Sequence, residues 1–373
     1  MSRKPLHVMM VGLRGFPNVQ GGVETHVENL CRELIRLNCA ITVLVRASHQ
    51  HPSIGGEWNN IHFKKIWAFS FVSLEAIVHT LLGVLYAGIT RPDILHIHAI
   101  GPALMTPLAR LLRLRVVVTH HGEDYRRQKW GKLARYVLRV GERFGMKYAN
   151  ASIAISNGIH ASIVEKFGVT PAHIPNGVDL PKLAASPTVL QRFGIKPRQY
   201  ILLVSRFVPE KRHLDLIDAF RRAAIPDWKL VFVGKSDQRD DYTKLVKESV
   251  GASKDIVFTG FQGGEILHAL YLHAGVFVLP SSHEGLPISI LEAMSYGLPI
   301  IASDILPNRD ICDEAIDYFP LGDTAALAAL LKIKANSGFD EQRCNEIRNV
   351  IRGKFGWSDI AKQTHGVYLK TLQ

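Results

Sequence analysis

The chain has 373 residues, of which 47% are hydrophobic and 21% are charged, and this balance excludes an intrinsically disordered protein. The length is large for one hydrophobic core and suits two α/β domains. Lysine and arginine outnumber aspartate and glutamate by 45 to 33, and the resulting net charge of +12 indicates an anionic partner. The four cysteines have neither C-x-x-C nor metal-type spacing, so we expect reduced thiols in a cytoplasmic protein.

The first predicted strand, Val8 to Val11, is followed by a glycine-containing loop. The apolar run at the start of the chain stops at Arg14, so we expect a first strand there rather than a signal peptide. The glycines of the loop do not have the spacing of the G-x-G-x-x-G dinucleotide fingerprint. Gly21 and Gly22 stand directly before the predicted helix Val23 to Leu37, where their backbone could approach a phosphate or sugar oxygen closely. The alternative is that they only turn the chain.

A long apolar segment, Phe69 to Ile89, has about the length of a membrane span. Glu75 and His79 lie near its middle, and ionisable groups are expensive inside a bilayer. We therefore expect a buried or interfacial helix.

Histidines follow two of the predicted strands in the first half. His96 and His98 alternate along one strand, so they share a face and could form a metal pair, but the sequence offers no third ligand and a structural role is favoured. His120 and His121 come after the apolar run VVVT, at the end of a strand where α/β sheets bind ligands. On pattern alone, a hydrogen-bonded structural histidine is the more common case.

The densest basic run, Arg126 to Lys147, predicts an amphipathic helix. Four of its cations recur at steps of three or four residues and share one face, namely Lys132, Arg135, Arg139 and Arg143. Such a face suits an anionic membrane surface, and the alternative is a solvated face. Nucleic acid is disfavoured because no binding motif accompanies the charge.

Strands alternate with helices in two runs, which predicts mostly parallel sheets in two Rossmann-like domains. The strands of the first run are Val8 to Val11, Ile41 to Val45, Ile61 to Ile66, Ile94 to Ile97, Val116 to Thr119 and Ser152 to Ile155. Those of the second are Ile201 to Val204, Leu230 to Val233, Ile256 to Thr259, Val276 to Leu279, Pro299 to Ala302 and Ala315 to Phe319. Proline, asparagine and glycine concentrate around Pro175 to Ser186, so we place the domains at residues 1–175 and 176–355.

The segment SRFVPEK places two cations beside a strand end. Arg206 ends the strand and Lys211 follows five residues later in the next loop. Arginine binds phosphate oxygens through a fork and lysine acts as a point charge, so the two could hold a pyrophosphate. Isolated surface cations are the alternative.

The most informative segment is HEGLPISILEAMSYGLPIIAS, which starts at His283. Pro287 is predicted as the first helical residue, and the helix start offers backbone N–H groups to an anion. Glu284 precedes the helix and Glu292 lies inside it, so their carboxylates should be about 8–10 Å apart. They are too far apart to share a proton, but an extended ligand could contact both. Two solvated glutamates are the alternative, although the apolar neighbours of Glu292 disfavour it.

This E-x7-E pattern, with the EAMSYGLPIIAS continuation, resembles the retaining glycosyltransferases of family four, which have the GT-B fold and use nucleotide-sugars. Other segments agree in order and spacing, namely the Gly21-Gly22 loop, His121, IPNGVD, SRFVPEK and FGWSDIAKQTHGVYLKTL. The resemblance covers essentially the whole chain. One departure is Arg212, where the family more often has glycine, and it puts the loop shape in question.

The resemblance implies residue roles and an architecture. Two Rossmann-like domains would face each other across a cleft, and a last helix in residues 356–373 would cross back to the first domain. The implied donor-binding residues are Gly21, Gly22, Arg206, Lys211, Leu286, Ile288 and Glu292. His121 and Glu284 would act at the transferring sugar, with His120 as its uninvolved neighbour. The sequence contains no D-x-D, so we expect no metal ion and no cofactor.

The expected activity is transfer of a hexose from a UDP- or GDP-sugar to a hydroxyl of a glycan acceptor, with retention. The basic, apolar first domain favours a lipid-linked or surface-polysaccharide acceptor at the cytoplasmic face of the membrane. A nucleotide-sugar epimerase of the same fold and a non-catalytic nucleotide-sugar-binding scaffold are the alternatives. An inverting glycoside hydrolase is disfavoured, because its substrate would lack a phosphate for Arg206.

Overall fold

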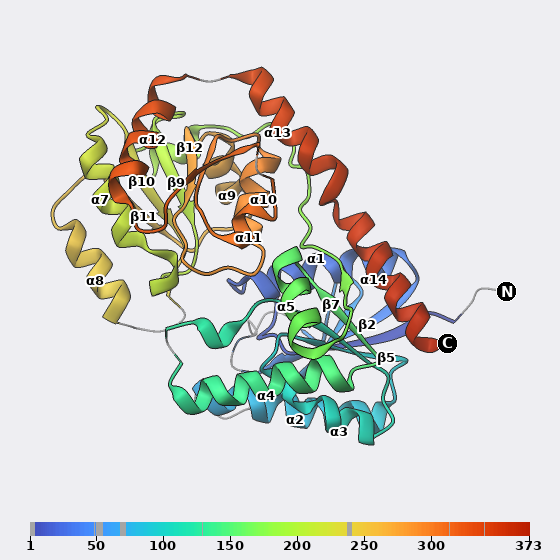
Figure 1. Cartoon of the computed structure of the whole chain (residues 1–373). Coiled ribbons are helices and arrows are strands. Elements are labelled where there is room, and N and C mark those ends of the chain that lie inside the picture. The colour runs from blue at the N-terminus through green and yellow to red at the C-terminus, as the bar shows by residue number, and fades with distance from the viewer. Residues whose placement is uncertain are drawn as a thin grey trace. The chain divides into compact units, whose positions relative to one another are not determined.

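The computed structural model describes residues 4–47, 49, 55–67, 72–128, 130–236, 241–312, 314–338 and 340–373. The chain forms two compact units (Figure 1): unit 1 comprises residues 1–177 and 357–373, and unit 2 comprises residues 178–356. The predicted domain boundary after residue 175 lies two residues from this division.

Unit 1 contains an eight-stranded sheet that is parallel except at one edge. Its order is β3-β4-β2-β1-β5-β6-β7-β8, and β3 alone is antiparallel to its neighbour. The strands are β1 (Leu6–Val11), β2 (Cys39–Arg46), β3 (Glu57–Trp58), β4 (Ile61–Ile66), β5 (Ile94–His98), β6 (Val116–His120), β7 (Ala151–Ala154) and β8 (Ala172–His173). The six predicted strands are present, and the two that the sequence pattern missed are the two-residue strands β3 and β8.

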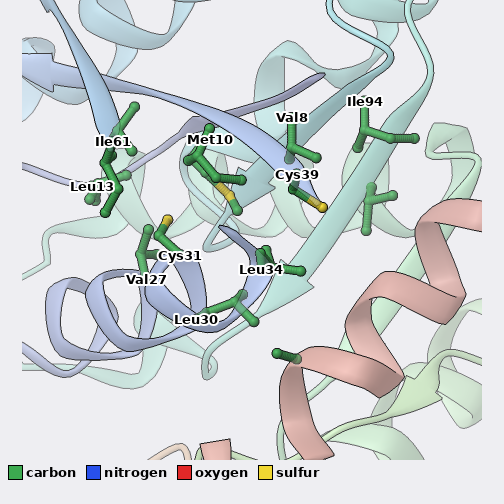
Figure 2. Close-up of a cluster of buried hydrophobic side chains, with 14 of the residues drawn as sticks. Val8, Met10, Leu13, Val27, Leu30, Cys31, Leu34, Cys39, Ile61 and Ile94 are labelled. Atoms are coloured by element: carbon green, nitrogen blue, oxygen red, sulfur yellow. The ribbon is translucent and has the colours of Figure 1, made fainter. Parts of the chain in front are cut away.

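The helices of unit 1 include the last one of the chain. They are α1 (Gly22–Arg36), α2 (Val72–Thr90), η1 (Pro102–Met105), α3 (Thr106–Leu111), η2 (Asp124–Arg126), α4 (Lys132–Tyr148), α5 (Asn157–Phe167) and α14 (Trp357–Leu372). Helix α14 packs against α1. Its Trp357 and Tyr368 belong to the core cluster that also holds Leu30 and Leu34 of α1. Figure 2 shows the apolar face of α1 against the sheet strands.

Helix α2 corresponds to the helix predicted in the segment Phe69 to Ile89, of which residues 69–71 lie outside the described residues. It packs against β1 and β4 of the sheet. Glu75 forms an ion pair with Arg46 at 3.2 Å, and His79 is fully buried. In the described parts of the chain, no helix is long and apolar enough to span a membrane.

Unit 2 contains a six-stranded, fully parallel sheet of order β11-β10-β9-β12-β13-β14. The strands are β9 (Tyr200–Val204), β10 (Lys229–Val233), β11 (Ile256–Gly260), β12 (Val276–Leu279), β13 (Ile300–Ser303) and β14 (Ile316–Phe319). The helices are α6 (Thr188–Gln191), η3 (Pro209–Lys211), α7 (His213–Ala223), α8 (Asp241–Val250), α9 (Gly264–Leu272), α10 (Ile288–Ser295), α11 (Leu306–Arg309), α12 (Thr324–Asn336) and α13 (Glu341–Lys354).

The strand order of each sheet reverses at one point. In unit 1 the reversal lies between β1 and β5, and in unit 2 it lies between β9 and β12. Open α/β sheets bind ligands outside the carboxyl ends of the strands at such points. In each unit, predicted site residues therefore follow the strands at the point where a ligand would be expected.

Candidate functional site

In unit 2, two neighbouring strands bring the predicted cations and acids to one edge. Strands β9 and β12 are paired in parallel, with Ile201 opposite Val276. Arg206 follows β9, whereas Glu284 follows β12. The Ser282 N–H donates to the Glu210 carbonyl at 2.8 Å and so ties the two loops together. The structure thus brings together residues that are more than 70 positions apart in the sequence.

Lys211 and Glu284 form an ion pair with 2.5 Å between Nζ and Oε1. Their side chains are only 16% and 11% exposed. Burial opposes ionisation of Glu284, but the charge and hydrogen bond of Lys211 outweigh it and lower the pKa of this carboxyl. The sequence assigned the two residues to different parts of a ligand. In the structure they neutralise each other, so an incoming anion would have to share or displace Glu284.

Glu292 lies within α10 and is held by Tyr271, whose hydroxyl donates to Oε2 at 2.7 Å. Tyr271 in turn stacks on Tyr296 with ring centroids 5.2 Å apart. Burial raises the pKa of Glu292 to about 7, although the Tyr271 hydrogen bond acts in the opposite direction. Glu284 and Glu292 therefore have separate partners and opposite pKa shifts, as two acids with different roles would. Tyr271 was not identified from the sequence, since nothing in its apolar helix pattern marks it.

Helix α10 starts one residue later than predicted. Pro287 is the N-cap residue, with φ −74° and ψ 107°, and the first helical residue is Ile288. The prediction of Pro287 as the first helical residue is therefore wrong by one position, because its ψ angle is extended. The residues Leu286 and Ile288 are 5% and 9% exposed. Any contact of these two residues with a ligand would be made mainly through the backbone at this helix start.

Arg212 adopts the left-handed conformation, with φ 49° and ψ 45°. This is the region that glycine enters without strain. Its guanidinium pairs with Asp215 at 2.5 Å. The chain therefore keeps a glycine-like turn after Lys211 although the residue is arginine.

In unit 1, the loop after β1 is fixed by an ion pair between Arg14 and Glu24 at 2.9 Å. A Cβ on Gly21 would lie 2.0 Å from Glu24 Oε2, so this carboxylate needs glycine there. A Cβ on Gly22 would meet no atom within 4 Å, so the start of α1 is open at that residue. The neighbouring carboxylate thus explains glycine at position 21, whereas no neighbouring atom requires glycine at position 22.

His121 belongs to a cluster of three histidines. Its Nε2 lies 3.1 Å from His98 Nδ1, and its ring centroid lies 4.9 Å from that of His26. Burial lowers the pKa of His26 to about 4 and the pKa values of His98 and His121 well below their usual value. These rings are therefore neutral at pH 7. His26 was not identified from the sequence, although it stands four residues after Gly22 at the start of α1.

Asn176 of the IPNGVD segment has a structural role, because its side chain contacts His26. His26 Nδ1 donates to Asn176 Oδ1 at 2.9 Å, across 150 residues. Nε2 of His26 is thereby left as the acceptor nitrogen.

His120 and His96 have structural environments. His120 Nε2 donates to Glu142 at 2.9 Å, while its Nδ1 accepts from the Gly122 N–H at 3.2 Å. His96 contacts the Tyr368 hydroxyl and the Thr119 hydroxyl, each at 2.7 Å. Both nitrogens of each ring are used, as expected for packing residues.

One group of histidines has metal-type spacing, and it contains His98 but not His96 of the pair that the sequence suggested. Ring nitrogens of His26, His98 and His121 all lie within 4.8 Å of one another. A third partner for His98 therefore exists, but the His98–His121 and His26–Asn176 contacts already use part of this set. The expectation of a metal-independent protein stays a prediction.

The predicted basic face lies on α4. Lys132 begins the helix, and Arg135, Arg139 and Arg143 line a cavity of 630 Å³ together with Arg126 and Lys166. This part of unit 1 is therefore hollowed, and Lys132 does not contribute to the cavity.

Comparisons with known proteins identify the family of the chain. Residues 20–182 match the model of the family described as Glycosyltransferase Family 4, and residues 188–347 match that described as Glycosyl transferases group 1. The chain belongs to the family-four glycosyltransferases of the GT-B type.

Among curated relatives, the chain is 31% identical to the UDP-Gal:alpha-D-GlcNAc-diphosphoundecaprenol alpha-1,3-galactosyltransferase of Escherichia coli, over 61% of this chain and 62% of the relative. The matches with this relative and two others span 36 to 62% of those relatives' lengths.

Solved structures match the whole fold. The sucrose-phosphate synthase of Thermosynechococcus elongatus has a TM-score of 0.81 and 21% identity, with 98% of both chains covered. The HepE protein of Anabaena in complex with UDP-glucose has a TM-score of 0.80 and 18% identity, with 98% of this chain and 99% of that chain covered. The fold is therefore GT-B, with two parallel-sheet domains.

Proposed function

We propose that the protein is a retaining glycosyltransferase that moves a hexose from a UDP- or GDP-sugar to a hydroxyl of a glycan acceptor. The observation that carries this proposal is the convergence of Arg206, Lys211, Glu284 and the start of α10 at the reversal point of the unit 2 sheet. Two cations and a helix N-terminus suit a diphosphate, and two acids suit hydroxyl groups.

Each residue then has a role in the proposed reaction. Arg206 and Lys211 hold the pyrophosphate, Glu284 the sugar hydroxyls and Glu292 the ribose, while Leu286 and Ile288 contribute the backbone at the helix start. Gly21 and Gly22 approach the donor from the loop after β1. His121 contacts the transferring sugar beside the acceptor. The fixed partners of His120 support the choice of His121 between these neighbours.

Charge on the departing nucleoside diphosphate is met by the two cations and by the start of α10. A metal ion is not required in this scheme, and turnover should be unchanged by a chelator. None of the proposed contact residues is an evident nucleophile, so retention would proceed by attack on the same face from which the diphosphate departs.

The proposed acceptor is a lipid-linked glycan of surface-polysaccharide assembly, handled at the cytoplasmic side of the membrane by a peripheral protein. The Escherichia coli relative acts on a diphosphoundecaprenol-linked sugar by its name. The basic face with Lys132, Arg135, Arg139 and Arg143 suits such an anionic environment.

The test of donor binding is thermal unfolding against a panel of nucleotide-sugars. A ligand at 100 times its dissociation constant stabilises the folded chain by about 2.7 kcal/mol. Stabilisation by free glycans but by no nucleotide-sugar would contradict the proposal. Isomerised nucleotide-sugar formed without acceptor would favour the epimerase, and donor binding without diphosphate release would favour the scaffold.

The test of catalysis is Arg206→Ala, which should lower turnover by about 10²–10³ because a preorganised donor to the leaving group is lost. Arg222→Ala is the matched control, since Arg222 is a 57% exposed cation of the same unit that pairs with Asp218. It should change turnover less than about twofold. Equal turnover of the two variants would contradict the assigned role, and the product anomer, measured by NMR, tests retention.

A further inference from the structure

The cavity beside α4, here called the α4 pocket, has a strongly basic lining that the proposed donor site does not use. Its volume is 630 Å³, and its charged residues are Arg126, Arg135, Arg139, Arg143, Lys166 and Glu142. All of them belong to unit 1. The volume is in the usual range for a small-molecule site.

Only part of this positive charge is balanced within the protein. Lys166 pairs with Glu123 and lies 3.8 Å from Glu142, and Arg126 pairs with Glu123 at 2.5 Å. These two acids thus balance two cations of the pocket.

The three arginines of α4 remain. Among the described residues, Arg135, Arg139 and Arg143 have no carboxylate partner. The Nε–H of Arg135 is buried, and it has no hydrogen-bond partner among the residues that the structure describes. Arg139 lies over the ring of Tyr125, 5.3 Å from its centroid. The pocket therefore carries an excess of about three positive charges and an unused buried donor.

The pocket is joined to the predicted transfer residue through a short loop. Glu142 lines the pocket and accepts the hydrogen bond of His120, the direct neighbour of His121. Tyr125, four residues after His121, lines the same pocket. Both features lie in unit 1, which is the acceptor side in the proposed reaction.

The surroundings of the pocket are apolar as well as basic. Leu133 and Tyr136, on the first turns of α4, are 77% and 65% exposed. Arginine forks around a hollow suit the oxygens of a discrete phosphate group, and exposed apolar side chains beside them suit a hydrocarbon chain. A diffuse contact with a charged surface would need no hollow.

We propose that the α4 pocket binds the diphosphate of a prenyl-diphosphate-linked acceptor, and that Arg135, Arg139 and Arg143 supply the donors. This inference rests on the proposed function and names its acceptor class. The binding experiment needs no transfer reaction, so its failure is distinct from failure of the donor assignment.

The experiment titrates geranyl diphosphate, with geraniol as the uncharged probe, into the full chain by calorimetry. The background carries Arg206→Ala, Lys211→Met and Glu284→Gln, which removes the other predicted diphosphate site without leaving the Glu284 carboxylate unpaired. Geranyl diphosphate should bind and geraniol should not. Adding Arg135→Ala and Arg143→Ala should weaken binding about tenfold or more, because charge-assisted hydrogen bonds are lost.

The matched control adds Lys132→Ala and Lys147→Ala, which remove the same charge from α4 outside the pocket lining. Binding should then change less than about twofold. Arg135→Lys with Arg143→Lys keeps the charge but loses the forks, and should give an intermediate affinity.

Three outcomes would overturn the proposal. Absence of binding before the α4 substitutions is the first, and equal weakening by both alanine pairs, which would assign binding to general charge, is the second. The third comes from binding to phosphatidylcholine vesicles with and without phosphatidylglycerol, measured before and after the α4 arginines are replaced. If the α4 arginines affected only binding to the anionic vesicles, the occupant would be membrane headgroups.

Discussion

At the scale of single residues, the Lys211–Glu284 pair sets the charge balance of the proposed donor site before any ligand binds. Both side chains are largely buried, so each depends on the other for its charge. This pair was not predictable from the sequence, which gave each residue a motif position but no contact between loops 73 residues apart. Motif spacing selected the candidate residues, whereas their mutual partners depend on how β9 and β12 pair.

Lys211→Met should destabilise the chain by about 2–4 kcal/mol, because the carboxylate of Glu284 is left unpaired. The double variant with Glu284→Gln should recover most of this loss. Chemical unfolding measures both. Lys244→Met is the control, since Lys244 is 75% exposed and 3.7 Å from Glu248, and should cost less than about 0.5 kcal/mol. A double variant as unstable as Lys211→Met would contradict the account.

Glu292 gives a pH-dependent prediction. Its pKa, raised by burial from 4.5 to about 7, means that the folded chain holds this proton more tightly than the unfolded chain. The stability it contributes is therefore full at low pH and is lost as pH rises through about 7. We compare the free energy of unfolding of Glu292→Gln with that of the unsubstituted chain at each pH. This difference should favour the variant by about 2–3 kcal/mol more at pH 8.5 than at pH 5. Parallel pH profiles of unfolding would contradict this.

At the scale of elements, the sequence predicted the long strands and missed contacts that local patterns do not encode. Twelve apolar runs bounded by turn residues became strands in the two sheets. The strands β3 and β8 have two residues each, which is too short to show alternation. His26 was missed for a different reason, because its partners His98, His121 and Asn176 come from distant parts of unit 1.

The turn after Lys211 carries the prediction at this scale. Arg212→Gly and Arg212→Val both lose the ion pair with Asp215, but only valine has a branched Cβ at φ 49°. Valine should therefore be less stable than glycine by about 1–2 kcal/mol. Urea unfolding of the two variants measures the difference, and equal stabilities would mean that the turn relaxes without cost.

At the scale of the whole molecule, buried histidines are distributed unequally between the units. Unit 1 holds His26, His79, His96, His98 and His121, whose pKa values burial lowers, whereas unit 2 holds His213, with a pKa lowered to about 3. A lowered pKa means that the unfolded chain takes up the proton first. Stability is therefore present above about pH 6.5 and falls as the solution becomes more acidic.

Unit 1 should accordingly be the more acid-sensitive part. Each such histidine lowers the free energy of unfolding by about 1.4 kcal/mol at pH 5.5, because this pH is one unit below the pKa of about 6.5 that a histidine has in the unfolded chain. Thermolysin digestion at pH 7 and pH 5.5, with identification of the fragments, measures this. Cleavage sites in residues 4–177 should gain more in rate than sites in residues 178–356. A larger gain in the second range would contradict the histidine account.

The return of α14 to the core of unit 1 has a consequence for biosynthesis. Trp357, Ile360, Ala361 and Tyr368 complete a cluster whose other buried members lie in the first half of the chain. During translation, the apolar face of α1 and His96 would lack their contacts with α14 until the whole of unit 2 has been synthesised. A segment translated late thus closes a core whose other elements are translated much earlier, and a nascent chain stalled before residue 357 would be a natural client for chaperones.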